Sequence, residues 1–391
     1  MGILGGQNKS RKAIEMLIGA VVGVGLFGIP FAFVQAGFWI GMIYLIVLGF
    51  VAITLAMMFA EVIMQIPGRH RMYGYVQKYF GKKWGVVAAL TVMGSTWGGL
   101  VAYVLVGGEF TFALLSPYIG GSLFTYQLSF LLIGFLVALR GLAFVARTES
   151  YLVAALVTVI LIIVARGAFD VDVNNYTMLS GNNVLLPYGV VLFALGGTNV
   201  IPELKDLLGR SSRKIRRAIP IGYLIIIALY AAFAFAVVGV SGADTTPESI
   251  IGLSDVLGPW ILILGSVMGL LAVITSFIVL SVVLQDMIEF DFGTSRLIAW
   301  LITVSVPLVI FLSGARSFIE VMNFTGAVFG GMFGIFVIMM YLRVRERTCT
   351  SPAKCFAISK WISYAILVLF VTGILIVVLE KPFKFISESL S

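Results

Sequence analysis

The sequence predicts an all-helical membrane protein with eleven membrane-spanning helices. Of its 391 residues, 60% are hydrophobic and only 11% are charged, whereas roughly a quarter of the residues in soluble domains are charged. The apolar residues fall into repeated runs of about 20 residues, the length at which a helix crosses the hydrocarbon core. Backbone groups in lipid must bond to one another, so these runs are expected to be helices.

Eleven apolar segments are bounded by polar or charged residues. They cover residues 12–36, 38–65, 85–112, 126–143, 148–168, 185–208, 217–241, 258–285, 295–314, 317–342 and 358–380. The first is too long for the core of a signal peptide, so we expect it to be retained as the first span. Residues 1–391 then form a single transmembrane domain.

Lysine and arginine residues predict the orientation, because they favour the cytoplasmic side. With eleven spans and a cytoplasmic N-terminus, all 26 basic residues face the cytoplasm except Arg166, Arg316, Lys381 and Lys384. We therefore expect a multi-pass protein of the cell membrane with its C-terminus outside. The basic residues lie between apolar runs and form no single basic face, so nucleic acid is not an expected partner.

Two connections have compositions that suggest a structure. Residues 67–83, on the predicted inner side, mix aromatic and basic residues, which favours a helix lying on the membrane surface. Residues 242–258, on the outer side, contain acids and Pro247 but no basic residue. We interpret this outer segment as a candidate lid.

Two spans carry glycines and a proline near their middle. Residues 19–30 contain Gly25 five positions before Pro30, and residues 193–202 contain Gly197 five positions before Pro202. Glycine tolerates non-helical angles and proline removes a helical hydrogen bond, so each span is expected to unwind. The alternative is that the glycines only allow close helix packing.

The two predicted breaks fall in the first spans of two five-span halves. Such breaks are typical of inverted repeats with a substrate site near the membrane midplane. The first repeat covers about residues 12–168 and the second about residues 185–342, and the span at 358–380 is an extra helix.

Three stretches resemble the amino acid/auxin permease family of the amino acid–polyamine–organocation superfamily. Residues 23–37 are similar to the family's first helix, and the stretch from Tyr103 to Glu109 is similar to its third. Residues 275–286 resemble the eighth helix of its bacterial members that carry aromatic or neutral amino acids. The resemblance covers about residues 10–345. It implies the fold of sodium-coupled leucine transporters, with two inverted five-helix repeats and one extra helix.

The resemblance also implies roles for the two breaks. Freed amides near Gly23, Val24 and Gly25 would bind an amino acid's carboxylate at the positive end of a half-helix. Freed carbonyls near Phe193, Ala194 and Gly196 would bind its ammonium. Together these groups suit a zwitterion because they bury no net charge.

Side-chain selection would then depend on other residues near mid-depth. Gly196 and Gly197 leave room, and the further candidates are Trp97, Gly98, Ala102, Tyr103, Phe193, Thr198, Phe277, Asn323 and Phe324. None has a definite charge, which favours a neutral apolar or aromatic L-amino acid because a buried unpaired charge costs several kcal/mol. Alternatively, these aromatic residues are helix-packing core.

A coupling ion, Na⁺ or H⁺, is the expected cofactor, and no other is expected. The resemblance implies a Na⁺ site built from the carbonyls of Gly19, Val22 and Ala272 and the hydroxyls of Thr275 and Ser276. Hard cations prefer such oxygen ligands. The alternative is that the two hydroxyls bond to their own helix. The fifth span has no mid-membrane lysine to replace the cation, which favours Na⁺, although some relatives in this family use protons.

Other function classes fit the sequence less well. A channel needs a polar lining, and no span has a regular polar stripe. No paired acids or Ser/His arrangement suggests an enzyme. We therefore expect a secondary active transporter that works by alternating access as a monomer. The alternative is an amino acid sensor with a transporter fold, which would bind its ligand without transporting it.

Charged residues inside spans are further functional candidates. Glu61 and Glu109 lie near the ends of the second and third spans, where we expect them to reach water. Glu203 follows the second break. The alternative to a functional role is that Glu203 forms a local ion pair with Lys205 or another inner charge. Asp286 is expected to mark the inner end of the eighth span.

Overall fold

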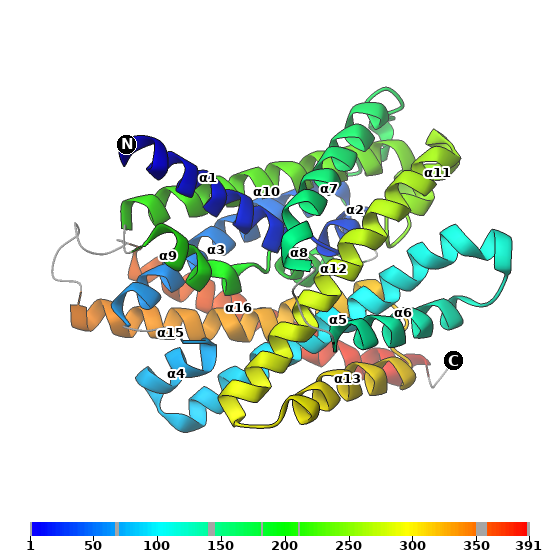
Figure 1. The fold of residues 1–391 in the computed structure, drawn as a ribbon. Coiled ribbons are helices and arrows are strands. Elements are labelled where there is room, and N and C mark those ends of the chain that lie inside the picture. The colour runs from blue at the N-terminus through cyan, green and yellow to red at the C-terminus, as the bar shows by residue number, and fades with distance from the viewer. Residues whose placement is uncertain are drawn as a thin grey trace.

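The computed structural model describes residues 2–66, 70–139, 145–180, 183–209, 212–348 and 358–388, and it contains no β-strand within these ranges (Figure 1). The helical elements in chain order are α1 (Gly2–Val21), α2 (Gly25–Ala36), α3 (Phe38–Gln65), α4 (Met72–Phe80), α5 (Lys82–Ile119), α6 (Leu123–Ala138), α7 (Val145–Gly167), η1 (Val173–Asn175), α8 (Leu186–Ala194), η2 (Thr198–Val200), α9 (Ile201–Leu208), α10 (Ser212–Ser241), η3 (Gly242–Asp244), α11 (Ile250–Leu257), α12 (Pro259–Phe292), α13 (Arg296–Leu312), α14 (Phe318–Phe324), η4 (Thr325–Gly330), α15 (Gly331–Thr348) and α16 (Lys360–Glu388).

Every predicted span contains a helix or a broken helix. In the described part of the chain, α3, α5, α10, α12, α16 and the continuous α14–η4–α15 are long and apolar enough to cross a membrane. Helices α1 and α2 form a further span that bends by 59° at its break. Helix α6, the part of α7 from Val153 to Gly167, and α13 are apolar but shorter. Helices α8 and α9 form an interrupted span.

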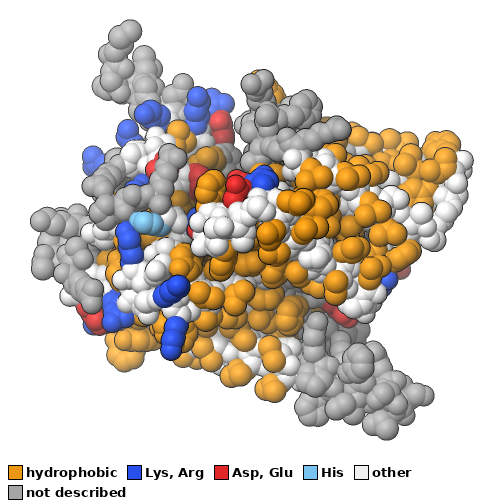
Figure 2. Space-filling model, turned by 60° about the horizontal axis from the view of Figure 1, so that its bottom comes forward, with side chains coloured by type: hydrophobic (Ala, Val, Ile, Leu, Met, Phe, Trp, Pro, Cys, Tyr) orange, Lys and Arg blue, Asp and Glu red, His pale blue; other side chains and the backbone are white. Residues whose placement is uncertain are grey.

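The helices cross the bundle from one end to the other. Helix α1 begins at the end where α4 and α9 lie, and α16 finishes at the opposite end (Figure 1), as an odd number of spans requires. Hydrophobic side chains cover a broad band of the face in Figure 2, and most of its Lys and Arg side chains gather at one end. Large apolar side chains such as Ile46 and Phe50 of α3 are exposed, which suits a lipid-facing surface.

The first span is broken between Val21 and Gly25. The last amide to bond back into α1 is that of Val22, 2.8 Å from the carbonyl oxygen of Ile18. The amides of Leu26 and Phe27 then bond three residues back, to Gly23 and Val24, at 3.2 and 3.1 Å. Pro30 lies inside α2 beyond the break, so the interruption coincides with the glycines and not with the proline.

The sixth span is broken after Ala194. Residues 195–197 lie outside any helix, and η2 leads into α9. Pro202 occupies the first turn of α9, where its missing N–H removes no helical hydrogen bond. In both spans, therefore, glycines coincide with the break, and the proline follows it.

The tenth span contains a π-helical turn, η4, which was not predicted from the sequence. An added Cβ at Gly326 in this turn would lie 2.0 Å from the carbonyl oxygen of Gly189 in α8. An added Cβ at Gly189 would in turn lie 2.2 Å from the carbonyl oxygen of Asn323. The backbones of the sixth and tenth spans thus touch because neither glycine carries a side chain.

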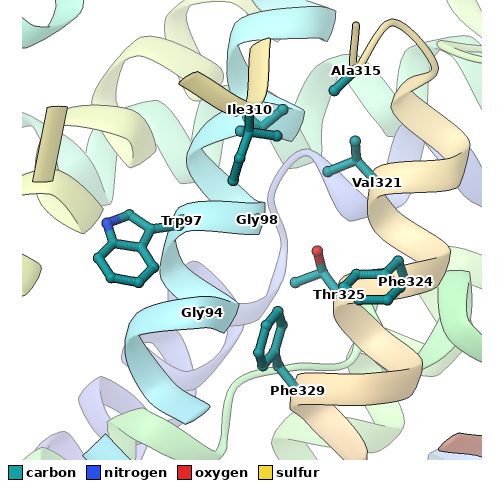
Figure 3. Close-up of a pocket in the computed structure, with 10 residues that line it drawn as sticks. Gly94, Trp97, Gly98, Ile310, Ala315, Val321, Phe324, Thr325 and Phe329 are labelled. Atoms are coloured by element: carbon teal, nitrogen blue, oxygen red, sulfur yellow. The ribbon is translucent and has the colours of Figure 1, made fainter. Parts of the chain in front are cut away.

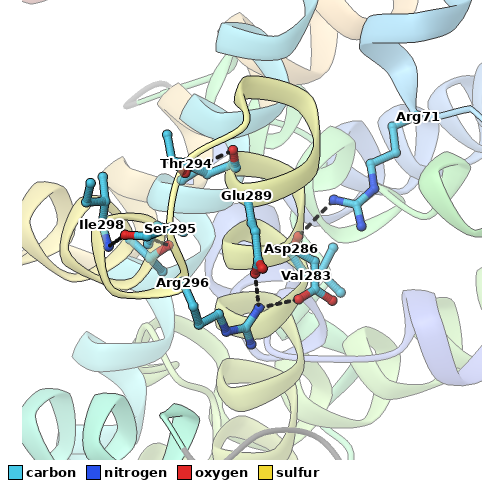
Figure 4. Close-up of polar contacts among 11 residues, drawn as sticks. Arg71, Val283, Asp286, Glu289, Thr294, Ser295, Arg296 and Ile298 are labelled. Carbon is cyan, nitrogen blue, oxygen red and sulfur yellow. Dashed lines mark hydrogen bonds and ion pairs between the residues drawn. The ribbon is translucent and has the colours of Figure 1, made fainter.

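The end of the bundle that holds α4 is joined by polar contacts. Helix α4 is the helix predicted within residues 67–83, of which residues 67–69 are outside the described ranges. Its neighbour Arg71 donates to the carbonyl of Val283 in α12 at 3.4 Å, and Arg296 pairs with Asp286 and with Glu289 (Figure 4). Helix α12 continues past Asp286 to Phe292, and Asp286 pairs with Arg296. That Asp286 marks the inner end of the eighth span stays a prediction.

Candidate functional site

The two helix breaks lie directly against each other. An added Cβ at Gly25 in the first break would lie 2.6 Å from the Cα atom of Ala194 in the second. An added Cβ at Gly197 in the second break would lie 2.0 Å from Cγ2 of Val21 in the first. The contact is therefore reciprocal, since each break places a glycine against the last residue of the opposite half-helix.

The first break offers hydrogen-bond donors. No described backbone carbonyl accepts from the amides of Gly23 or Val24, and both residues precede the N-terminus of α2. A helix N-terminus carries a partial positive charge and attracts anions. This arrangement suits a carboxylate.

The second break offers acceptors at the C-terminal, negative end of α8. The carbonyl of Phe193 accepts from the amide of Gly196 at 3.1 Å, and that of Ala194 accepts from the Tyr230 hydroxyl at 3.0 Å. Each carbonyl oxygen has a second lone pair. Gly196 is exposed in this structure, so its part of the break is open to a solute.

Three tyrosines from neighbouring spans surround the breaks. Tyr103 of α5 hydrogen-bonds Ser276, and its hydroxyl would lie 3.5 Å from an added Cβ at Gly23. Tyr223 and Tyr230 both belong to α10, and their hydroxyls donate to break carbonyls. Tyr103 was predicted from the sequence, whereas Tyr223 and Tyr230 were not. Their spacing of seven residues, which places two hydroxyls on one face of an apolar helix, is the signal that could have identified them.

An apolar cavity of about 320 Å³ lies between α5, the end of α13 and the α14–η4 segment. Its volume falls within the roughly 300–1,000 Å³ range of small-molecule pockets. Gly94 and Gly98 form one wall, and Phe324, Thr325 and Phe329 face them (Figure 3). The indole of Trp97 points away from Thr325 and Phe329 in this view. Its Nε1 is buried without a partner among the described residues.

Comparison with protein-family models settles the family. The model of the tryptophan/tyrosine permease family matches residues 7–379. The chain belongs to this family. It is also 20% identical over 367 residues to tyrosine-specific transport system 1 of Haemophilus influenzae, an alignment that covers 89% of this chain and 91% of that protein.

Solved structures establish the fold of this permease. MhsT in complex with L-phenylalanine is similar with a TM-score of 0.62 and 16% identity, covering 94% of this chain and 98% of that one. Mhp1 is a nucleobase-cation-symport-1 family transporter, solved in a closed conformation with bromovinylhydantoin bound. It is similar with a TM-score of 0.65 and 14% identity, covering 96% of this chain and 92% of that one. The permease therefore has the expected fold of sodium-coupled leucine transporters, with the first and sixth spans broken.

The residues of the predicted Na⁺ site have other contacts in this structure. The Thr275 hydroxyl donates to the carbonyls of Leu271 and Ala272, each at 3.0 Å. Ser276 hydrogen-bonds Tyr103. An added Cβ at Gly19 would meet Val153 of α7 at 3.4 Å. Bonding of a hydroxyl to its own helix, the alternative considered for this pair, is thus present at Thr275, and the coupling ion remains a prediction.

Other candidate residues have different surroundings from those predicted. Phe277 is fully buried against Phe130 and Phe135 of α6, so it is packing core. Glu61 does not reach water, because its side chain is 1% exposed and accepts a hydrogen bond from Gln65 at 3.0 Å. Lys205 donates to the carbonyl of Ile63 at 3.0 Å, and Glu203 is exposed. The local pairing of Glu203 stays a prediction.

The side of the breaks toward α11 is closed by aromatic packing and the candidate lid. The ring of Phe27 lies 5.2 Å from that of Phe110 and 6.3 Å from that of Phe233, and all three side chains are buried. The fully buried Ser249 of residues 242–258 donates to the Phe27 carbonyl at 2.5 Å. The segment is thus attached to α2 immediately beyond the first break.

Proposed function

We propose that this permease moves a neutral aromatic L-amino acid across the membrane by alternating access, coupled to Na⁺ or H⁺. The observation that carries the proposal is the meeting of two opposite helix ends at the paired breaks. The N-terminus of α2 presents donors and the C-terminus of α8 presents acceptors. An amino acid zwitterion needs both.

The α-carboxylate binds the amides near Gly23, Val24 and Gly25 in this proposal, and the ammonium binds the carbonyls near Phe193, Ala194 and Gly196. Trp97 and Tyr103 of α5 select the side chain, next to the apolar cavity between α5 and η4. No charged residue lines that cavity in the described part of the chain. A charged side chain would be buried there without a partner, at a cost of several kcal/mol.

Two relatives support an aromatic substrate. The Haemophilus influenzae protein is a tyrosine-specific transport system, and MhsT was solved with L-phenylalanine. The motifs at residues 23–37, 103–109 and 275–286 support the further proposal that the chain belongs to the wider amino acid/auxin permease family.

Alternating access is supported by the asymmetry of the structure around the breaks. Phe27 and Ser249 are buried on the side of the lid, whereas Gly196 and Asn199 are exposed at the other break. In the proposed cycle, the structure described here is closed toward the outside, and separation of the lid from α2 opens the breaks to that side.

Uptake into proteoliposomes that contain the purified permease tests the proposal. Radiolabelled tyrosine, tryptophan and phenylalanine are expected to enter and to compete with one another. Strong uptake of glutamate or lysine without such competition would overturn the substrate assignment.

The same vesicles test the coupling ion when a sodium gradient and a proton gradient are imposed separately. The ligand set of Gly19, Val22, Ala272, Thr275 and Ser276 favours Na⁺. Thr275→Ala should then raise the sodium concentration needed for half-maximal uptake, whereas Thr303→Ala, which removes a buried hydroxyl bonded to its own helix in α13, should leave it unchanged. Uptake that follows the proton gradient and ignores sodium would reject this ligand set.

A further inference from the structure

We propose that Tyr230 is a positioning residue that holds the two helix breaks together through one shared hydroxyl. Its oxygen lies 2.9 Å from the carbonyl oxygen of Val21 and 3.0 Å from that of Ala194. These are the last residues of α1 and α8. One side chain of the seventh span thus contacts both broken spans.

The two carbonyls need this donor because neither has another partner across its break. No described backbone amide outside the helices donates to Val21 or Ala194. The last carbonyls of a helix lack intrahelical donors, and two helix C-termini that converge bring together two negative dipole ends. The hydroxyl proton of Tyr230 is the positive group that the structure places between them.

The surroundings of Tyr230 make this contact specific. Its side chain is fully buried, so water does not readily replace the hydroxyl. A phenol ring is rigid, and the position of its oxygen is set by where α10 packs. Val21 and Ala194 are also the residues that contact Gly197 and Gly25 of the opposite break. The hydroxyl and the two glycine contacts therefore act at one point, and separation of the two breaks would disrupt all three.

Tyr223 provides a matched control on the same helix. It is also fully buried, but its hydroxyl lies 3.5 Å from the Leu195 carbonyl and hydrogen-bonds Thr198. Both partners belong to the second break. Removal of its hydroxyl therefore disturbs one break and leaves the connection between the two intact.

The functional consequence rests on the proposed transport of an amino acid. If the hydroxyl aligns the breaks before substrate arrives, its loss weakens binding of the zwitterion. A buried group left without its hydrogen bond costs about 1–3 kcal/mol, and tenfold in an equilibrium constant corresponds to about 1.4 kcal/mol. Tyr230→Phe is expected to raise KM for uptake at least tenfold, and Tyr223→Phe less than threefold.

A distance measurement separates positioning from a general loss of stability. Spin labels at Lys12 of α1 and Asp206 of α9, in protein with Cys349 and Cys355 replaced by serine, report the spacing between one half-helix of each broken span without substrate. Tyr230→Phe should broaden this distance distribution, and Tyr223→Phe should not. KM within twofold of the unaltered protein together with an unchanged distribution would overturn the proposal.

A second variant keeps the test valid if Tyr230→Phe folds poorly. Replacement of Tyr230 by para-aminophenylalanine retains a donor at the same place and should restore KM and the narrow distribution. Failure of this variant, despite a folded and monodisperse protein, would count against the shared hydrogen bond. If the unaltered protein transports no amino acid, the proposed function fails, and the distance distributions still decide the role of Tyr230.

Discussion

At the scale of single residues, the glycines of the two breaks act by allowing contact. Gly25 and Gly197 each lie against the opposite break at distances that no Cβ would permit. Their value is therefore close approach as well as flexible backbone angles. Gly197, which the sequence suggested as room for substrate, also provides the space that Val21 occupies.

Gly25→Ala should reduce uptake at least tenfold and lower stability by about 1–3 kcal/mol, as overpacking typically does. The added Cβ would meet the backbone Cα of Ala194 at 2.6 Å, and backbone cannot rotate away. Proteoliposome uptake and thermal unfolding in detergent measure the two effects. Gly331→Ala is the control, because its Cβ would approach side-chain atoms and no backbone: Cγ1 and Cδ1 of Ile374 at 3.1 and 3.2 Å, and the Phe370 Cβ at 3.8 Å. Equal effects of the two substitutions would contradict this account.

At the scale of elements, the segment from Gly242 to Gly258 behaves as part of the closed wall. Thr245, Glu248 and Ser249 are buried although the segment is a connection between spans. Ser249 adopts a left-handed conformation with φ of 64°, which places its hydroxyl on the Phe27 carbonyl. Residues of this segment therefore stabilise the first break from outside the membrane span.

The closed position of this segment should be favoured by acid. Burial raises the pKa of the Glu248 carboxyl, although hydrogen bonds from Thr246 and from backbone amides oppose the shift. The Glu109 carboxyl faces Glu248 electrostatically, so the two carboxylates repel each other when both are charged. A carboxyl whose pKa is raised by burial stabilises the buried state at low pH, and this contribution is lost as the pH rises through the raised pKa.

Hydrogen exchange of residues 242–258, corrected for intrinsic rates, measures this dependence. Protection should increase from neutral pH toward pH ~5, near the ordinary range of a glutamate carboxyl. Glu248→Gln should flatten the profile. Glu320→Gln is a control on α14, because Glu320 is exposed. Protection that increases with pH in the unaltered protein would show that the sign is wrong.

At the scale of the whole molecule, the arrangement of spans places the two ends of the chain on opposite sides. Helices α1 and α16 begin and finish at opposite ends of the bundle (Figure 1). On the face in Figure 2, most of the Lys and Arg side chains that the structure describes gather at one end. Both features agree with the predicted odd number of spans, and the cytoplasmic position of the N-terminus stays a prediction.

Cysteine labelling from outside intact cells tests this orientation. In protein with Cys349 and Cys355 replaced by serine, an impermeant maleimide should react with Lys384→Cys and leave Lys78→Cys unlabelled. Permeabilised cells are the control, in which both positions should react. The opposite labelling pattern would reject the predicted orientation.

The positions of the spans and of both breaks could be predicted from the sequence by itself. Apolar length decides where a helix crosses a membrane, and the glycines of residues 19–28 and 196–197 act on their own segment of backbone. Helix α4 was likewise predicted from local composition. These are short-range effects, so no knowledge of neighbouring helices was needed.

Only the tertiary structure decided which groups meet across spans. Hydrocarbon tails are as apolar as leucine, so hydropathy does not separate a lipid-facing side of a helix from a packed one. For this reason Phe277 was left as a candidate for side-chain selection although it packs on α6, and Glu61 was placed near water although it is buried. The contact of Tyr230 with Val21 and Ala194 joins residues about 209 and 36 positions apart. It exists because α10 packs against both broken spans, and no local pattern encodes that packing.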